Sequence, residues 1–110
     1  MMIPPNNPAR FCEPEVFETL YRFNARLSLQ VESTMYLCVL RAPDSPTAEA
    51  LVQHLQTNLD HGEVICEKEP CVYYMQAFAD REEEIIIRLD DARECVPGVV
   101  TQYMPIPKED

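Results

Sequence analysis

Glycine and histidine are scarce in this sequence and tryptophan is absent, with two glycines and two histidines in 110 residues. Phosphate-binding loops need glycines that let the backbone approach the ligand, so no loop of that kind is expected. The histidines, His54 and His61, have no cysteine pair at zinc-finger spacing, and Cys-x-x-Cys does not occur. We therefore predict a protein that is not an enzyme, with no catalytic residues, cofactor or metal ligands.

Long apolar runs are also missing. No run approaches the ~18 residues that a membrane-spanning helix requires, and the start, Met1 to Asn6, lacks the basic and apolar regions of a signal peptide. Five cysteines, an odd number, are typical of free thiols in a reducing compartment. Cys66 and Cys71 flank a predicted turn and are the pair best placed to crosslink on oxidation. We expect a cytoplasmic protein without membrane insertion.

Basic residues are few: 19 acids face nine bases, giving a formal charge of −10. Residues 1–59 hold six acids and four bases, whereas residues 60–110 hold thirteen acids and five bases. An acidic surface repels phosphate backbones, so we expect no direct nucleic-acid binding. It favours a basic protein partner, although the same charge also serves solubility alone.

The length predicts one domain over residues 1–110, with an irregular proline-rich lead-in over 1–13 and a C-terminal tail over 105–110. A first helix is predicted over 14–27 from apolar residues at helical spacing. Its stripe consists of Val16, Leu20, Phe23 and Leu27, with Phe17 alongside. The apolar run over 35–42 predicts a central strand buried on both faces.

A second helix is predicted after Pro46, with Ser45 as its N-cap and Gly62 at its end. Two β-rich runs, 63–67 and 71–79, follow across a polar link and predict a hairpin. A last strand is predicted over residues 99–104.

The segment over residues 80–95 has two interpretations. As a strand, Ile85, Ile87 and Leu89 alternate. As a helix, Ile85 and Leu89 share a stripe with Ala92 and Val96, and Asp80 with Glu83 resembles a capping box. We favour the helix, because Pro97-Gly98 is a stop signal. The order then becomes an α+β fold: a ferredoxin-like β-α-β-β-α-β antiparallel sheet with an added N-terminal helix.

This order resembles the GGDEF domain of diguanylate cyclases over roughly residues 14–104. The resemblance rests on the Phe-x-x-Leu helix, Phe17 to Leu20, and on the segment Gly62 to Met75, which is similar to the family's hairpin region. The family signature would fall at Glu67-Lys68-Glu69-Pro70, where no glycine is present. The family's metal ligand at the end of the first strand corresponds to Leu40-Arg41-Ala42-Pro43. The resemblance therefore implies a degenerate, catalytically dead member.

Our functional hypothesis is a non-catalytic regulatory module that binds a protein, with a homodimer left open. The alternative is a small stand-alone inhibitor, of viral or immunity type, that blocks a basic or nucleic-acid-binding protein with its acidic face. A helix over 81–95 that buries one apolar stripe turns its acids toward solvent or to the flanks. The predicted protein-binding residues are Glu82, Glu83, Glu84, Asp90, Asp91 and Glu94.

Overall fold

The computed structural model describes residues 11–27, 33–59 and 63–106. These residues form an α+β fold in which three helices pack against one sheet. In chain order the elements are β1 (Phe11–Cys12), α1 (Pro14–Leu27), β2 (Thr34–Arg41), α2 (Ser45–Thr57), β3 (Val64–Glu69), β4 (Val72–Ala79), α3 (Glu82–Cys95) and β5 (Val100–Pro105). The predicted helices and strands are present, and the short strand β1 lies in the segment that we expected to be irregular.

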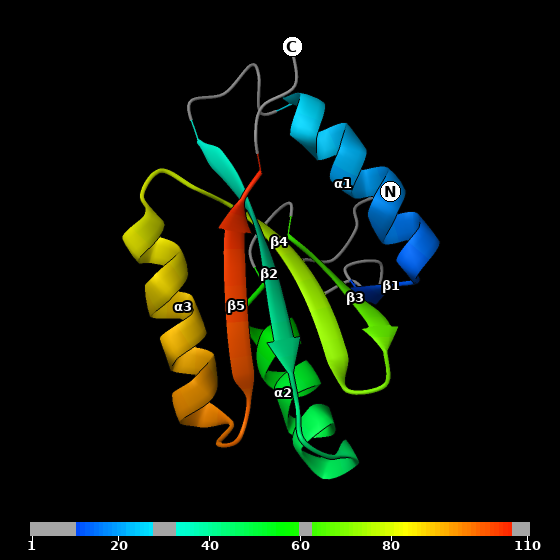
Figure 1. Ribbon diagram of the computed structural model, residues 1–110, viewed down its shortest axis with the longest axis vertical. Helices are drawn as coiled ribbons and strands as arrows, with labels where there is room; N and C mark the ends of the chain where they lie inside the picture. Colours follow the sequence, from blue (N-terminus) through cyan, green and yellow to red (C-terminus); the bar gives the residue numbers. More distant parts are fainter. Residues whose placement is uncertain (1–10, 28–32, 60–62, 107–110) are drawn as a thin grey trace.

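The strands lie in the order β1-β3-β4-β2-β5, and Figure 1 shows the four longer ones side by side. β2 pairs antiparallel with both β4 and β5, while β3 pairs antiparallel with β4. β1 adds to the far edge by parallel pairing with β3. β2 therefore occupies the interior of the sheet, as the apolar run predicted, and β5 forms one of its two edges.

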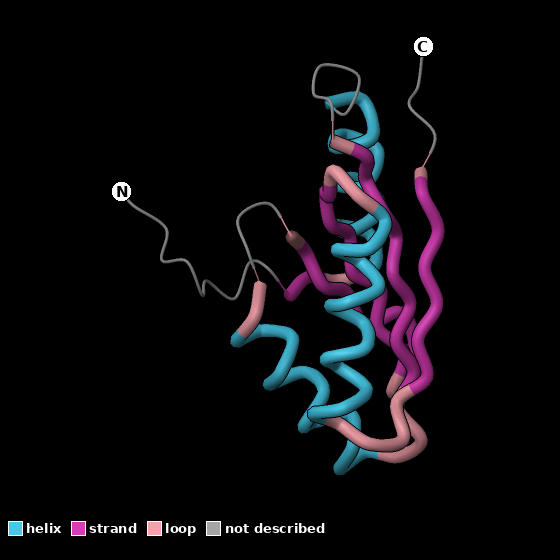
Figure 2. Tube along the Cα trace, turned by 90° about the vertical axis from the view of Figure 1, so that its left-hand side faces the viewer, coloured by secondary structure: helices cyan, strands magenta, loops and turns pink. Residues whose placement is uncertain are grey.

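The two faces of the sheet are covered unequally. On one face, Tyr36, Cys38 and Leu40 of β2 pack in the core cluster that includes residues of α2 and α3. On the other face α1 contributes Phe17, which packs against Val64 and Cys66 of β3. Figure 2 shows α2 and α3 on one side of the strands.

The segment over residues 80–95 is helical, so of the two interpretations the helix is confirmed. Ile85, Leu89 and Ala92 are buried in the main core, where they join Leu51 of α2. Ile87, which a strand would have placed on the same face as Ile85, is 65% exposed. The period of 3.6 residues, not the run of isoleucines, decided the local structure.

The N-cap of α2 is Asp44 and not Ser45. Asp44 has an extended backbone, and its Oδ1 accepts a hydrogen bond of 2.9 Å from the backbone N–H of Thr47. This hydrogen bond lowers the pKa of the Asp44 carboxyl. Pro46 lies in the first turn as predicted, because its missing N–H has no partner to lose there. Gly62, the predicted end of this helix, lies outside the described residues.

The N-cap of α3 is also displaced by one residue, from Asp80 to Arg81. The backbone N–H of Arg81 donates to Glu84 Oε2 at 2.9 Å, so Glu84 rather than Glu83 completes the capping interaction. Asp80 instead accepts a hydrogen bond of 2.7 Å from the Ser33 hydroxyl. That contact with the start of β2 explains why Asp80 does not cap its own helix.

The buried stripe of α1 differs from the predicted one. Phe17 is buried and Leu20 and Tyr21 pack beside it, whereas Val16 is 48% and Phe23 is 58% exposed. Helical spacing alone permits either stripe. The choice follows from the position of α1, which packs on β3 and β4 and leaves two apolar side chains of the helix in solvent.

The hairpin turn is tighter than predicted. β3 extends to Glu69, and the turn consists of Pro70 and Cys71, with Cys71 in the left-handed region at φ 67°. Cys66 packs with Phe17 on one face of the sheet, whereas Cys71 packs against the core of the opposite face. The expectation that Cys66 and Cys71 are well placed to crosslink is therefore wrong, because the sheet lies between their side chains.

We predict that Leu89→Ala lowers the free energy of unfolding by about 2–5 kcal/mol, because it leaves a cavity under α3. Glu83→Ala, on the exposed side of the same helix, should change it by about 0.5 kcal/mol or less. Denaturant midpoints of the two variants measure the difference. Equal midpoints would contradict the burial of Leu89 between α3 and the sheet.

Candidate protein-binding face

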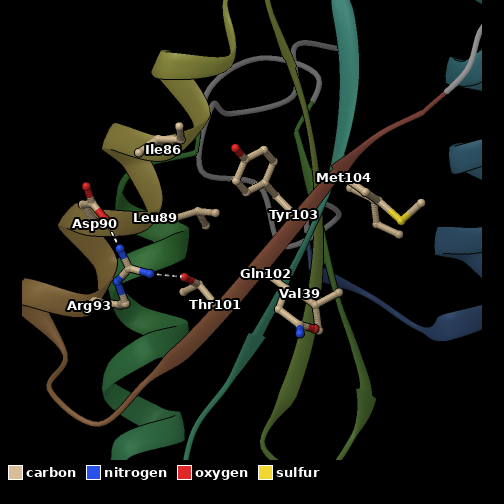
Figure 3. A pocket seen from close by; sticks show the side chains of 10 residues that line it. Val39, Ile86, Leu89, Asp90, Arg93, Thr101, Gln102, Tyr103 and Met104 are labelled. Carbon is tan, nitrogen blue, oxygen red and sulfur yellow. Dashed lines mark hydrogen bonds and ion pairs between the residues drawn. The ribbon is translucent and has the colours of Figure 1, made fainter.

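A groove of about 460 Å³ lies between α3 and β5 and continues around the outer edge of β5. Figure 3 shows Thr101 and Tyr103 on the α3 side of β5 and Met104 pointing away from α3. No strand among the described residues pairs with this edge of β5. The groove is lined by Leu37, Val39, Ile86, Leu89, Asp90, Arg93, Thr101, Gln102, Tyr103 and Met104. It therefore places apolar side chains beside backbone groups that have no partner strand there.

Arg93 connects the two walls of the groove. Its Nη1 donates a hydrogen bond of 2.8 Å to the Thr101 hydroxyl, and its other terminal nitrogen forms an ion pair with Asp90 (Figure 3). About half of each side chain in the ion pair is exposed, so we assign the pair roughly 1 kcal/mol or less. These contacts hold the charged groups of Asp90 and Arg93 close to β5. They contribute little to the stability of the fold.

Tyr103 lines the groove and contacts Glu82 of α3. A hydrogen bond to the Glu82 carboxylate raises the pKa of the Tyr103 hydroxyl. Tyr103 also stacks at a tilt on Tyr36, with ring centroids 6.2 Å apart. The position of the Tyr103 side chain is therefore restrained by its contacts with Glu82 and Tyr36.

The six acids predicted to form one binding face point in several directions. Glu82 reaches Tyr103, Glu84 caps its own helix and Asp90 pairs with Arg93. Asp91 faces α2. Glu83 and Glu94 are exposed, and no hydrogen bond or ion pair connects either of them to another described residue. The structure thus places Asp90 at the groove and Glu82 in contact with Tyr103 of its lining, whereas Glu83 and Glu94 occupy exposed positions of α3.

Arg88 lies on the same helix but points to the interior. Its Nη2 lies 2.6 Å from Oε1 of Glu63, a side chain that is 4% exposed, and it donates to the Asn58 carbonyl at 3.1 Å. Removing one member of a buried ion pair commonly costs several kcal/mol, since the other charge is left without compensation. This pair therefore fixes α3 against the end of α2 and the start of β3.

A second group of polar side chains joins α2 to α3. His54 Nε2 lies 3.3 Å from Asp91 Oδ2, and the Cys95 thiol donates to Asp91 Oδ1 over 3.8 Å. Local desolvation, followed by the negative charge of Asp91, raises the pKa of the Cys95 thiol. Sequence reasoning missed this cluster. The spacing of Asp91 and Cys95 places them one turn apart, but nothing in the sequence connects them with His54.

Asp91 lies between His54 and Cys95, and this arrangement argues against nucleophilic catalysis. The carboxylate contacts both the imidazole and the thiol, so it stabilises the protonated thiol instead of removing its proton. A catalytic cysteine needs a base or a positive charge that lowers its pKa. The cluster offers three ligand atoms for a metal more readily than a nucleophile.

No family model matches the chain, and no match was found among curated proteins or among solved structures. Among the described residues, no helix has the length and apolar character needed to cross a membrane.

We predict that thiol reagents distinguish the cysteines of the native protein. Burial raises the pKa of Cys38 to about 12, so at pH 8 only about one thiol in ten thousand is the reactive thiolate. Cys38 and Cys66 should stay unmodified, while Cys71 and Cys95 react. Peptide mass spectrometry after brief alkylation at pH 8 measures the pattern.

The same experiment tests the effect of Asp91 on Cys95. Asp91→Asn removes a negative charge, lowers the pKa of the thiol and should accelerate alkylation of Cys95 at constant pH. Asp90→Asn is the control, because Asp90 pairs with Arg93 on another side of α3. Equal acceleration in both variants would show that the contact with Asp91 is not the cause.

Proposed function

We propose that this protein is a non-catalytic, acidic regulatory module that binds a protein partner through α3 and β5. The observation that carries the proposal is an apolar groove, lined in part by Asp90 of α3, beside the edge of β5 that no strand among the described residues pairs with. Bound peptides commonly add a strand to such an edge and place alternate side chains in adjacent pockets. The partner would therefore present an extended segment with apolar and basic side chains.

The scaffold proposed is a ferredoxin-like β-α-β-β-α-β sheet with an added N-terminal helix. The order β3-β4-β2-β5, with antiparallel pairing among these four strands, supports it. The same order of elements supports a relation to a degenerate GGDEF domain. The turn at Pro70 and Cys71 has no glycine that would let a nucleotide phosphate approach the backbone, which supports a member without cyclase activity.

The chemistry of the groove favours a basic partner. Ile86 and Met104 are 38% and 54% exposed, so their burial by a ligand removes apolar surface from water. Acids near this surface attract Lys and Arg, and they raise association rates at low salt. The exposed Glu83 and Glu94 of the same helix add to this field.

A stand-alone inhibitor remains the second candidate. It is favoured by the concentration of negative charge in residues 60–110, where thirteen acids face five bases. A surface of this kind competes with phosphate backbones for a basic, nucleic-acid-binding protein. The two candidates differ in what the partner does, and both use the same face.

We predict that Glu83→Lys combined with Glu94→Lys slows association with a basic partner by about tenfold at low salt. The effect should shrink between about 0.01 and 0.15 M salt, as the Debye length falls from about 30 to about 8 Å. The partner is recovered with the wild-type protein as bait, and association rates are then measured with the purified pair.

The matched control is Glu18→Lys combined with Glu49→Lys, which changes the net charge equally on exposed positions of α1 and α2. Similar slowing by the control would show that net charge, not the face of α3, attracts the partner. Unchanged rates in both variants would limit the acidic residues to a role in solubility.

We also predict no nucleotide cyclase activity. Incubation of the purified protein with GTP and Mg²⁺ should give no cyclic dinucleotide above a blank, because neither the hairpin tip nor the end of β2 carries the family's ligands. Cyclic product that increases with protein concentration would overturn the non-enzymatic function.

A further inference from the structure

The group formed by His54, Asp91 and Cys95 has the composition of a metal site. The three side chains supply an imidazole nitrogen, a carboxylate oxygen and a sulfur, and these ligand atoms lie within 4.8 Å of one another. Imidazole and thiolate are preferred by zinc and related transition metals, whereas magnesium and calcium prefer oxygen ligands alone. The residue types therefore select a zinc-class ion.

The ligand atoms lie near the separations of tetrahedral coordination, with the two shortest distances running to different oxygens of Asp91 and all three ligands within 4.8 Å of one another. With bonds of about 2.0–2.3 Å, a four-coordinate zinc ion holds its ligand atoms roughly 3.3–3.7 Å apart. His54 Nε2 and Asp91 Oδ2 are 3.3 Å apart, and Asp91 Oδ1 and Cys95 Sγ are 3.8 Å apart. Small side-chain rotations suffice to bring the three ligands around one ion.

The surroundings hold the ligands in place. Asp91 and Cys95 share one face of α3, and the His54 side chain is only 16% exposed. The Asn58 amide lies 3.4 Å from His54 Nδ1, the ring nitrogen that faces away from Asp91, and also donates to the His54 carbonyl at 2.7 Å. Binding of a metal by Nε2 places the ring proton on Nδ1, so the Asn58 amide nitrogen, itself a donor, must then turn away from that ring nitrogen.

A hollow of about 250 Å³ adjoins the cluster and is lined by His54, Asn58, Arg88 and Asp91 among others. It has room for an ion together with a water molecule at a fourth position. Arg88 does not bring an uncompensated positive charge to it, since Glu63 pairs with its guanidinium at 2.6 Å.

We propose that His54 Nε2, an Asp91 carboxylate oxygen and Cys95 Sγ bind a zinc-class divalent cation that joins α2 to α3. Three protein ligands leave the fourth position to water or to a side chain of a partner. Binding replaces the proton of the Cys95 thiol, which leaves to solvent, and requires the His54 proton to reside on Nδ1. This site is independent of the proposed partner face, because the groove beside β5 is lined by a different side of α3.

The test uses the full chain, freed of metal with a chelator and kept reduced without added thiols. Titration with Co²⁺ should give the near-ultraviolet charge-transfer absorbance of a cobalt–thiolate bond, and Zn²⁺ should abolish it by displacement at equal stoichiometry. Mg²⁺ in large excess should not displace Co²⁺, since it binds thiolate and imidazole poorly.

Cys95→Ser should abolish the charge-transfer absorbance, and His54→Gln and Asp91→Asn should each weaken Zn²⁺ affinity at least about tenfold. Cys71→Ser is the matched control, since Cys71 is a second accessible thiol and lies in the turn between β3 and β4, outside the cluster. Circular dichroism without metal should show that the variants fold, because Asp91 and Cys95 are exposed.

A second readout is thermal stability. Zn²⁺ should raise the unfolding midpoint of the wild-type protein and of Cys71→Ser, but not that of Cys95→Ser, because an ion bound only by the folded state stabilises it. The proposal is overturned if Cys95→Ser keeps the absorbance, if Cys71→Ser loses it, or if the wild-type protein shows none at stoichiometric Co²⁺.

Discussion

The burial of one narrow stripe of α3 on the sheet determines the surroundings of the whole helix. Ile85, Leu89 and Ala92 leave a single rotational position in which α3 satisfies its apolar contacts. The remaining directions follow from 3.6 residues per turn. In that position Arg88 meets Glu63, Asp91 meets His54, Arg93 meets Thr101, and Glu83 and Glu94 face solvent. The burial of this one apolar stripe thus determines which partner each charged residue of α3 can reach.

The spacing of apolar residues along the chain was sufficient to predict the helices and strands, but not the contacts between them. It gave the helices near residues 14–27 and 81–95 and the central strand β2, because spacing along the chain specifies which residues share a face. It did not give the buried face of α1, since Phe17 and Val16 are equally compatible with a helix. Only the position of β3 under that helix selects Phe17. The N-cap of α2 shifted by one residue because Asp44 and Ser45 both have suitable oxygens.

The candidate site was predictable in part for the same reason. The sequence indicated that α3 is acidic, and from it we predicted that six acids form one surface. Their separation into a cap, an ion pair, a contact with α2 and two exposed side chains depends on partners distant in sequence, such as Thr101 and His54. The groove itself was not predictable, because it arises where α3 meets the last strand of the sheet. The sequence predicts both elements but not how closely α3 and β5 approach each other.

β5 lacks the charged residues that commonly keep an exposed edge strand from pairing with other proteins. Its six residues, Val100 to Pro105, include no charged side chain, although edge strands commonly carry charges that prevent association with other strands. Glu82, Asp90 and Arg93 of α3 supply charges beside β5, and Asp90 and Arg93 pair with each other along the groove. A basic segment that pairs with the edge of β5 could compete for Asp90, whereas an uncharged strand would find no such contact. In the proposed function, the acids of α3 would favour basic partners at an edge whose own strand carries no charge, and this selectivity would link the charge of the helix to the open strand.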